Sequence, residues 1–353
     1  MPLNRYWTLS GKPLSGWPEA DTFVLRDAPI PKPADGQALT RTIYVSLDPY
    51  QWGYKRRGVE KPGAPCHART VAQVLESRMP GFKAGDFVFN TNGWAEYGLM
   101  GGPPSRAMDA LHPSYMIPRV LDPGQGRISL AVGVLGMLGL TAYAGMILMA
   151  APKAGETAVV SAASGGVGQI AGQLAKQKGA RVVGIAGRQE KCRFVVDELG
   201  FDACVSHLSA TFAQDLARAC GAGVDVYFEN VGGAAFEAVL PLFHHGARMT
   251  ICGLIAHYGD AGDARAALME RGASVFAERG VTVRDLFVGE FVEKHQEAFL
   301  REMVPLVASG AVKYREDMRV GLETIPKCFS EMLKGDNFGK MVVRVGEDPT
   351  LRG

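Results

Sequence analysis

The stretch AASGGVGQIAG, residues 162–172, places three glycines within four residues at the point where an apolar run gives way to a helical pattern. The run before it, TAVVSAA at 157–163, has the composition of a buried strand, and apolar residues recur at helical spacing after it. Glycines let a backbone approach phosphate groups closely, and the N–H groups at a helix start attract their negative charge. We therefore predict that this turn binds the pyrophosphate of a dinucleotide.

The motif departs at one position from the G-x-G-x-x-G pattern of such turns, because an alanine takes the place of the first glycine. Its place between a strand and a helix, at the head of three successive strand–helix units, still makes the prediction strong. The predicted pyrophosphate-binding residues are Ala163, Gly165, Gly166, Val167 and Gly168.

The pattern of the whole chain predicts two domains. Strand-like and helix-like stretches alternate from residue 157 to about residue 310, which is typical of a doubly wound parallel sheet, or Rossmann domain. Short strand-like stretches fill the first third of the chain and return in the tail at 339–345. The sequence thus predicts an α/β protein with a β-rich catalytic domain at 1–127, a Rossmann domain at 128–312, and a return segment at 313–353 that completes the catalytic domain.

The end of the second predicted strand favours NADP(H) over NAD(H). NAD-dependent enzymes place an acidic residue there for the ribose hydroxyl. This chain instead has Gly187 and Arg188, with Lys191 one helical turn later. Two cations suit a ribose phosphate, although solvated charges at a helix start are the alternative interpretation.

Composition excludes several other classes. The 353 residues are 47% hydrophobic and 21% charged, as in globular proteins, and the net charge of +2 gives no reason to expect a nucleic acid or an acidic membrane as partner. The densest basic run, YKRRG at 54–58, is expected to be a solvated loop. The uncharged segment 128–151 is long enough to span a bilayer, but its glycines favour a buried loop and helix instead.

The cysteines predict neither a disulfide framework nor a metal site. None of the six forms a C-x-x-C pair, and Cys66–His67 is the one Cys–His neighbour in the first domain. No G-H-E histidine motif of zinc alcohol dehydrogenases occurs. We therefore expect a metal-independent protein from a reducing compartment, with a cytoplasmic location.

Several stretches together resemble the zinc-independent medium-chain dehydrogenases/reductases that include leukotriene 12-hydroxydehydrogenase/prostaglandin reductases, alkenal double-bond reductases and curcumin reductases. The pieces run in the family's order over nearly the whole chain: VSLDPY, LGMLGLTAY, AASGGVGQIAGQLAKQKG, VVGIAGRQEKC, ELGFDA, VDVYFENVGG, ICGLIAHY and LKGDNFGKMVVRV. The resemblance implies a GroES-like catalytic domain beside the Rossmann domain, NADP(H) as cofactor and a homodimer.

The resemblance also implies further site residues. Lys191 matches the family's lysine for the 2′-phosphate, and Tyr50 and Tyr258 match tyrosines at the substrate end, which makes them the catalytic candidates. The remaining residues assigned to the cofactor are Gly187, Arg188, His207, Asn230, Cys252, Gly253, Leu254, Ile255, Tyr258, Leu286, Phe287, Val288 and Asn337.

Three departures from the family pattern bear on this assignment. Met137-Leu138-Gly139 stands where the family often has Met-Pro-Gly, and His207 stands where a tyrosine usually helps hold the 2′-phosphate. The basic residues that usually follow DPY arrive here as QWGYKRR. The first and third departures affect the substrate pocket, and the second affects NADPH affinity.

The family's reaction is the NADPH-dependent reduction of a carbon–carbon double bond conjugated to a carbonyl, so the expected substrate is an enal or enone. Such a site needs a hydrogen-bond donor near the enolate oxygen and a proton source, but no metal. Tyr258 follows the carboxyl end of a predicted strand, where open α/β sheets bind ligands. Two alternatives remain: an NADPH-dependent quinone or carbonyl oxidoreductase of the same fold, and an NADPH-binding protein without turnover.

Overall fold

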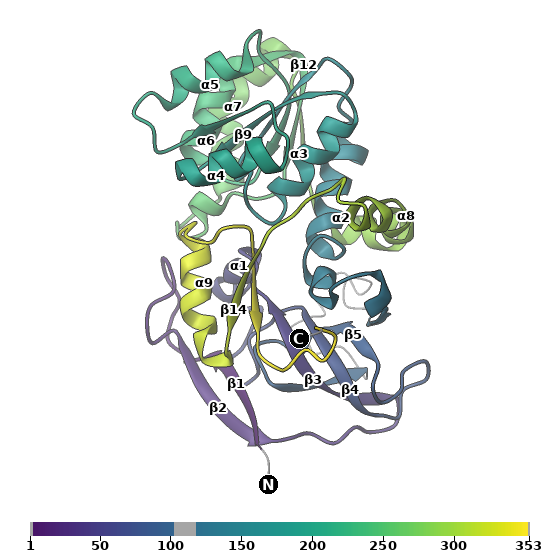
Figure 1. The fold of residues 1–353 in the computed structure, drawn as a ribbon. Coiled ribbons are helices and arrows are strands. Elements are labelled where there is room, and N and C mark those ends of the chain that lie inside the picture. The colour runs from purple at the N-terminus through teal and green to yellow at the C-terminus, as the bar shows by residue number, and fades with distance from the viewer. Residues whose placement is uncertain (1–2, 102–117, 352–353) are drawn as a thin grey trace. The chain divides into compact units, whose positions relative to one another are not determined.

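The computed structural model describes residues 3–101 and 118–351, and these form two compact units. The first unit contains residues 1–136, 316–337 and 341–353, and the second contains 137–315 and 338–340. The first unit contains two β-sheets and the second contains one (Figure 1).

The second unit is built on a six-stranded parallel sheet in the order β10-β9-β8-β11-β12-β13. From β8 the chain adds two strands on one side and then returns to add three on the other, which is the Rossmann order. The strands are β8 (Thr157–Val160), β9 (Arg181–Ala186), β10 (Ala203–Ser206), β11 (Val224–Glu229), β12 (Phe243–Ile251) and β13 (Thr282–Asp285).

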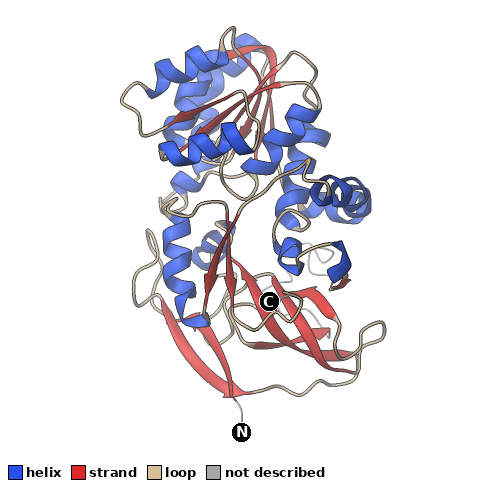
Figure 2. Cartoon of the chain, viewed as in Figure 1, coloured by secondary structure: helices blue, strands red, loops and turns tan. Residues whose placement is uncertain are grey.

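Helices cover both faces of this sheet (Figure 2). The helices of this unit are α2 (Met137–Tyr143), the π-helix η4 (Ala144–Ala150), α3 (Gly168–Gln177), α4 (Gln189–Arg193), η5 (Phe194–Glu198), α5 (Phe212–Cys220), α6 (Gly233–Val239), η6 (Leu240–Leu242), η7 (Ile255–His257), α7 (Ala264–Arg279) and α8 (Gly289–Ala308). One face packs a core in which Leu216 of α5, Phe236 of α6 and Phe276 of α7 contact sheet residues.

The predicted Rossmann domain is confirmed, but the sequence did not indicate α7. Asp263 caps that helix by accepting from the N–H groups of Arg265 and Ala266, and Gly280 ends it in the left-handed conformation with φ +61°. The small and charged residues between these caps give only a weak apolar stripe, of which Leu268, Gly272 and Phe276 are buried. The helix therefore depends on its caps and on packing against the sheet.

The first unit is built mainly from β-strands. A two-stranded sheet pairs β1 (Leu3–Leu9) with β2 (Phe23–Pro29), and a larger sheet has the order β14-β15-β3-β4-β5-β7, with β6 also paired to β3. The larger sheet comprises β3 (Gln37–Ser46), β4 (Thr70–Ser77), β5 (Phe87–Asn90), β6 (Tyr97–Gly101), β7 (Arg119–Leu121), β14 (Glu316–Val320) and β15 (Lys340–Arg344). Because Val342 of β15 pairs with Ser46 of β3, the tail completes the sheet of the first third, as predicted.

Short helices complete the first unit: α1 (Tyr50–Arg56), η2 (Pro123–Gln125), η3 (Ile128–Val132), η8 (Leu322–Thr324) and α9 (Ile325–Leu333). The expectation of a solvated loop at 54–58 is wrong, because 54–56 belong to α1 and Lys55 is fully buried. Its ammonium lies 2.9 Å from the Glu60 carboxylate and 4.9 Å from the centre of the Trp94 ring. Glu60 is only five residues from Lys55 in the sequence, but Trp94 comes from a distant segment, so the local pattern did not reveal that the ammonium is buried.

The uncharged segment 128–151 forms three short helices: η3 is separated from α2 by the turn at 133–136, and α2 continues directly into η4. Most of its side chains are buried. Across the part of the chain that the structure describes, every helix is too short or too polar to cross a membrane.

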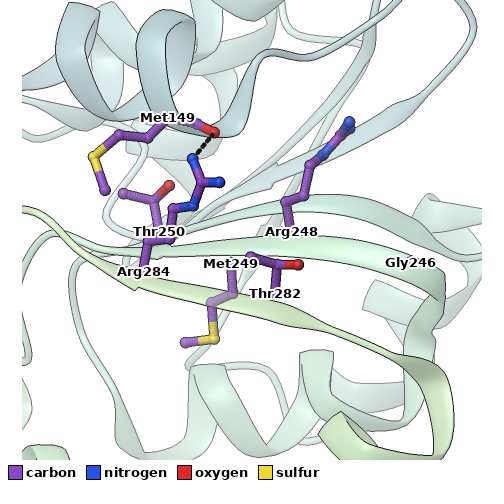
Figure 3. A pocket seen from close by; sticks show the side chains of 7 residues that line it. All are labelled: Met149, Gly246, Arg248, Met249, Thr250, Thr282 and Arg284. Carbon is purple, nitrogen blue, oxygen red and sulfur yellow. Dashed lines mark hydrogen bonds between the residues drawn. The ribbon is translucent and has the colours of Figure 1, made fainter.

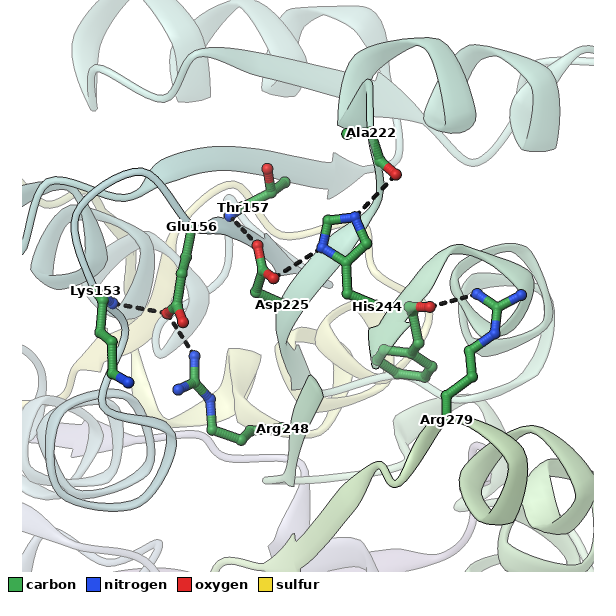
Figure 4. Close-up of polar contacts among 9 residues, drawn as sticks. Lys153, Glu156, Thr157, Ala222, Asp225, His244, Arg248 and Arg279 are labelled. Carbon is green, nitrogen blue, oxygen red and sulfur yellow. Dashed lines mark hydrogen bonds and ion pairs between the residues drawn. The ribbon is translucent and has the colours of Figure 1, made fainter. Parts of the chain in front are cut away.

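A polar network holds the strands of the Rossmann sheet near their amino ends (Figure 4). Asp225 accepts from the backbone N–H of Thr157 at 2.8 Å and lies 2.8 Å from Nδ1 of His244. Glu156 accepts from the backbone N–H of Lys153, also at 2.8 Å, and forms an ion pair with Arg248. The network thereby links β8, β11 and β12 at the edge opposite their carboxyl ends.

The hydrogen bond to Asp225 raises the pKa of His244, so this pair should make stability depend on pH. An unfolded histidine has a pKa of about 6.5, and below that pH the charge-dependent stabilisation is fully present. It is lost as the pH rises through the higher pKa that His244 has in the folded protein. Since His244 is 38% exposed, we expect the pair to contribute less than about 1 kcal/mol. His244→Gln should thus lower the thermal midpoint by up to about 3 °C at pH 6 and by less at pH 9.

The matched control is His245→Gln, because His245 is the exposed neighbour on the same strand. Thermal unfolding followed by circular dichroism at both pH values measures the difference. If His244→Gln lowered the thermal midpoint as much at pH 9 as at pH 6, the charge-dependent role of His244 would be contradicted.

Candidate dinucleotide-binding site

The glycine turn joins the carboxyl end of β8 to the start of α3. Gly165 N–H donates to the Ala162 carbonyl at 2.9 Å, and Ala162 itself has a positive φ of 49°. A Cβ at Gly168 would come within 2.3 Å of the Ala162 carbonyl oxygen. Only a glycine at 168 therefore allows the helix to start so close to the strand end.

The turn lies where an open sheet of this order binds ligands. β8 is the strand at which the chain reverses its direction of strand addition, with β9 on one side and β11 on the other. The crevice at the carboxyl ends of such strands is the common dinucleotide site of the fold. Val167, at the N-cap position of α3, has no polar side-chain atom, so the start of the helix presents backbone rather than a side-chain cap.

A buried carboxyl group, Glu229, organises the neighbouring strand end. Its side chain is fully buried and accepts from Ser161 Oγ and Tyr227 Oη, both at 2.6 Å, and from the Val231 N–H at 2.7 Å. Burial raises the pKa of the Glu229 carboxyl, although these donors oppose the shift. Asn230 then hydrogen-bonds to Ser161 through both its backbone and its side-chain amide, at 2.7 Å each. The turn after β8 and the predicted cofactor residue Asn230 are thus held together.

The backbone that follows β12 is hydrogen-bonded to the backbone of Glu229 and Asn230. The N–H groups of Cys252 and Gly253 donate to the Glu229 carbonyl at 2.8 and 3.1 Å, and the Ile255 N–H donates to the Asn230 carbonyl at 3.2 Å. A Cβ at Gly253 would lie 3.0 Å from the Tyr258 hydroxyl, so the phenol rests against this backbone. Tyr258 therefore lies at the carboxyl edge of the sheet.

The other predicted cofactor residues near the carboxyl edge of the sheet differ in how exposed they are. Leu286 follows β13, and its N–H donates to the Ile251 carbonyl at 2.9 Å. After it, Phe287 is exposed whereas Val288, like Leu254, is buried. Burial raises the pKa of the Cys252 thiol to about 12, so this cysteine stays protonated at neutral pH.

The end of β9 brings together the residues predicted to select the cofactor. Arg188 is exposed at the N-cap of α4, and Lys191 is buried on the first turn of that helix. The His207 N–H donates to the Ala186 carbonyl at 2.9 Å, and a Cβ at Gly187 would lie 3.5 Å from His207 Nε2. Burial and the nearby Lys191 charge lower the pKa of His207. The end of β9 thus carries one histidine and two cationic side chains.

Two predicted residues belong to the first unit. Tyr50 starts α1, where its hydroxyl contacts Arg69 and His67, and Asn337 lies in the segment between α9 and β15. The structure thus brings the Rossmann residues together and places these two within the other unit.

The sequence identified Asn230 but not the two groups that hold it, Ser161 and Glu229. Glu229 precedes Asn230 in the FENVGG stretch, and its charge inside an apolar strand was the available signal. Its role emerges only when β11 is known to pair with β8, because the Ser161 hydroxyl comes from the adjacent strand end.

A small hollow of about 180 Å³ lies elsewhere on the Rossmann sheet (Figure 3). It is lined by Met149, Gly246, Arg248, Met249, Thr250, Thr282 and Arg284, and its close-up shows the Arg284 side chain reaching the Met149 carbonyl. Because none of the predicted cofactor residues lines it, this hollow is not the candidate dinucleotide site. Among residues 3–101 and 118–351, no group of three or more His, Cys, Asp or Glu side chains could hold a metal ion.

Comparison with known proteins identifies the family. Residues 5–107 match the model described as the N-terminal domain of oxidoreductase, and 166–308 match the one described as zinc-binding dehydrogenase. The chain is 40% identical to the NADPH-dependent curcumin reductase of Escherichia coli over 98% of both chains. It is 33% identical to the NADP⁺-dependent 2-alkenal reductase of Nicotiana tabacum over 95% of this chain and 96% of the relative.

A solved structure agrees with these relatives. The crystal structure of CurA from Vibrio vulnificus in complex with NADPH matches with a TM-score of 0.87 and 37% identity, over 98% of this chain and 100% of that one. The chain therefore belongs to the medium-chain dehydrogenase/reductase family, in the subfamily of curcumin, prostaglandin and 2-alkenal reductases. It is an oxidoreductase, and the resemblance seen in its sequence is confirmed.

The end of β9 predicts a cofactor preference that can be measured. Each charge-assisted hydrogen bond to a phosphate is worth about 1.5–3 kcal/mol, and about 1.4 kcal/mol corresponds to tenfold in affinity. The double variant Arg188→Ala/Lys191→Ala should therefore bind NADPH on the order of a hundredfold more weakly and bind NADH about as well as before. Fluorescence titration of both nucleotides measures the ratio.

Lys178→Ala is the matched control, because Lys178 is an exposed lysine at the end of α3. We expect it to leave both affinities unchanged. If the double variant kept the NADPH/NADH ratio of the unmodified protein, the phosphate would be held by other residues and the assignment would fail.

Proposed function

We propose that this protein reduces the carbon–carbon double bond of α,β-unsaturated aldehydes or ketones with NADPH. Hydride goes to the β-carbon and a proton to the α-carbon, while negative charge develops on the carbonyl oxygen. The observation that carries the proposal is the ordered carboxyl edge of the Rossmann sheet in a chain that is 40% identical, end to end, to an NADPH-dependent curcumin reductase.

The residues at this edge fit NADP(H). The close approach at Gly168 leaves the turn as bare backbone, which suits a pyrophosphate at the start of α3. Arg188, Lys191 and His207 suit the 2′-phosphate. Asn230 and the stretch 252–255 would line the nicotinamide side, with Leu286–Val288 beside them and Asn337 as a further contact. The bound cofactor would supply the hydride.

The names of two relatives support the substrate class. A 2-alkenal is an α,β-unsaturated aldehyde, and curcumin contains conjugated enones, so both named substrates contain a double bond activated by a carbonyl group. A quinone or a simple ketone is the alternative acceptor for the same fold. We also propose a homodimer on the family resemblance and a cytoplasmic location on the cysteine usage.

Within this reaction, we assign Tyr258 to the charge that develops on the substrate. Its hydroxyl lies against Gly253 at the carboxyl edge, where it would donate a hydrogen bond to the carbonyl oxygen or a proton to the α-carbon. Neighbouring His257 has its Nδ1 2.8 Å from Asp260, an interaction at the surface, so the phenol is the better candidate. Tyr50 is the second candidate, from the first unit.

The acceptor class is tested by NADPH oxidation with three compounds side by side. We expect turnover with a 2-alkenal or a conjugated enone such as curcumin, and at least about tenfold lower kcat/KM with a quinone and with a saturated ketone, which corresponds to about 1.4 kcal/mol of transition-state stabilisation. Product analysis should find the saturated aldehyde or ketone. Preferred turnover of the quinone or the ketone would favour the alternative oxidoreductase, and tight NADPH binding without any turnover would favour a binding protein.

Tyr258→Phe removes only a hydroxyl and keeps the ring against Gly253. General acid catalysis and oxyanion donors each contribute a factor of about 10² or more, and water or a ribose hydroxyl can substitute in part. We therefore expect kcat to fall at least about tenfold, while NADPH affinity changes by less than about threefold. Steady-state kinetics and NADPH titration measure the two effects. Full turnover in the Phe variant would make Tyr258 a wall residue of the site.

A further inference from the structure

Two of the six cysteines of this chain, Cys192 and Cys204, form a pair inside the Rossmann unit. Cys192 is buried on α4, and Cys204 is partly exposed on β10. Both thiols are free, and they hydrogen-bond to each other. Their sulfur atoms are therefore neighbours that are not covalently bonded.

The sheet beneath the pair explains why the two thiols meet. Cys204 pairs in register with Gly184 of β9, and a Cβ at Gly184 would come within 3.2 Å of the Cys204 Sγ. The same Cβ would come within 2.9 Å of a methyl carbon of Val195, which belongs to η5, the continuation of α4. The Cys204 side chain thus lies on the face of the sheet that α4 and η5 cover. Because Gly184 has no side chain, the Cys204 thiol fits between sheet and helix and reaches Cys192.

The hydrogen bond makes the two sulfur atoms chemically unequal. It lowers the pKa of the Cys192 thiol, although burial opposes this shift. The same hydrogen bond raises the pKa of the Cys204 thiol, and burial adds to it. Thiolates, rather than thiols, attack peroxides and disulfides. The pair therefore combines a nucleophilic sulfur at Cys192 with a second thiol in contact with it.

The other four cysteines lack this combination. Burial raises the pKa of each of their thiols, to about 12 in three of them: Cys66, Cys220, Cys252 and, with a smaller shift, Cys328. Such thiols behave as small apolar side chains. Among the six cysteines, all of which lie in the described part of the chain, Cys192 is the one whose pKa is lowered.

The pair lies beside residues that we assign to the cofactor. Lys191 directly precedes Cys192 on α4, and Arg188 is at the N-cap of that helix. His207 follows the end of β10, three residues after Cys204. A covalent S–S bond is shorter than a hydrogen bond between two sulfur atoms, so its formation would draw α4 toward β10. The segment that moves is the one assigned to the 2′-phosphate.

We propose that Cys192 and Cys204 are a peroxide-sensitive modification site, at which a reversible disulfide weakens NADPH binding. The effect on NADPH rests on the proposed assignment of Arg188 and Lys191 to its 2′-phosphate. In a reducing compartment such a disulfide is transient and serves to sense oxidants.

The chemistry of the site needs one peroxide molecule for each disulfide. The Cys192 thiolate attacks one oxygen of hydrogen peroxide, the O–O bond breaks, and hydroxide leaves as the sulfur becomes a sulfenic acid. The Cys204 sulfur then bonds to the Cys192 sulfur, and the hydroxyl group of the sulfenic acid leaves as water with the proton of the Cys204 thiol. Two thiols are thereby oxidised by two electrons, and the peroxide is reduced to two water molecules. Dithiothreitol restores both thiols by exchange.

Peptide mapping tests whether the disulfide forms. The full-length protein is treated with hydrogen peroxide, its remaining thiols are alkylated, and it is digested with trypsin without reduction. Trypsin separates the two cysteines, because it releases Cys192 in the dipeptide 192–193 and Cys204 in the peptide 194–218, which contains no other cysteine. We expect these two peptides to be joined by a bond that dithiothreitol removes. If peroxide leaves them unlinked, the proposal is wrong.

Cysteine variants control the mapping. Cys192→Ser and Cys204→Ser should each abolish the linked peptides, and the corresponding Ala variants cover the case in which a buried hydroxyl prevents folding. Cys220→Ala is the matched control, because it removes another buried thiol of the same unit and should leave the linkage intact. Loss of the linkage in a folded Cys220→Ala protein would contradict the assignment of the pair.

Fluorescence titration tests the effect on the cofactor. The oxidised protein should bind NADPH at least about tenfold more weakly, which corresponds to losing one charge-assisted hydrogen bond to a phosphate. NADH lacks this phosphate, so its affinity should change by less than about threefold. Dithiothreitol should restore NADPH affinity, and peroxide should not change the NADPH affinity of Cys204→Ser. An oxidised protein that carries the disulfide and binds NADPH as before, or loses NADPH and NADH affinity equally, would overturn the proposed effect.

Thermodynamic linkage provides a second measurement of the same effect. If the disulfide weakens NADPH binding by a given factor, saturating NADPH must shift the equilibrium from disulfide to thiols by that factor. The fraction of linked peptides in glutathione redox buffers, with and without NADPH, measures this shift, and an unshifted equilibrium would contradict the proposal. Neither measurement uses an enone, so a failure of the disulfide leaves the proposed function standing, and a failure of enone reduction leaves the disulfide standing.

Discussion

The buried Glu229 carboxyl is the constraint on which the arrangement of the Rossmann edge depends. It receives hydrogen bonds from Ser161, Tyr227 and Val231, and its own backbone carbonyl receives the N–H groups of Cys252 and Gly253. One residue therefore joins the carboxyl ends of β8, β11 and β12. Leaving a buried acceptor of this kind without its donors costs about 1–3 kcal/mol for each partner, so the three strand ends keep one relative position. A site that binds a dinucleotide needs such preorganisation, since its backbone must be in place before the phosphates arrive.

Much of this fold could be predicted from local pattern. The alternation of apolar strands and amphipathic helices predicted the parallel sheet. The glycines at 165, 166 and 168 predicted the turn, because a helix that starts close to a strand end requires glycine there. Helix α7 was missed because its stability comes from the Asp263 cap and from burying Leu268 and Phe276, while most of its surface is polar or small. Periodicity detects helices with a broad apolar stripe, and this helix has a narrow one.

The candidate site residues divide in the same way. Asn230 and Lys191 stand in stretches that resemble a family, so they could be proposed from the sequence. Glu229 and Ser161 could not, because they meet through the pairing of two strands whose residues are 68 positions apart. The error at Lys55 has the same cause. A run of basic residues is usually solvated, but this ammonium pairs with the nearby Glu60 and lies over the rings of Trp94 and Phe329, which come from distant segments of the chain. Sequence reasoning underestimates such buried charges because the packing that buries them is tertiary.

Buried ionic groups in both units serve the same physical purpose. An ion pair such as Lys55–Glu60 gains little net stability over an apolar pair, because the desolvation of both groups offsets their attraction. What it does provide is a strong penalty for any arrangement that separates the partners. In the first unit that penalty fixes the His67 backbone beside the helix that carries Tyr50, and in the second unit the hydrogen bonds of Glu229 fix the backbone against which Tyr258 lies. Proton transfer tolerates little positional error. Charged groups that fix the position of the backbone are therefore useful beside the two candidate tyrosines, which explains why these groups remain buried there.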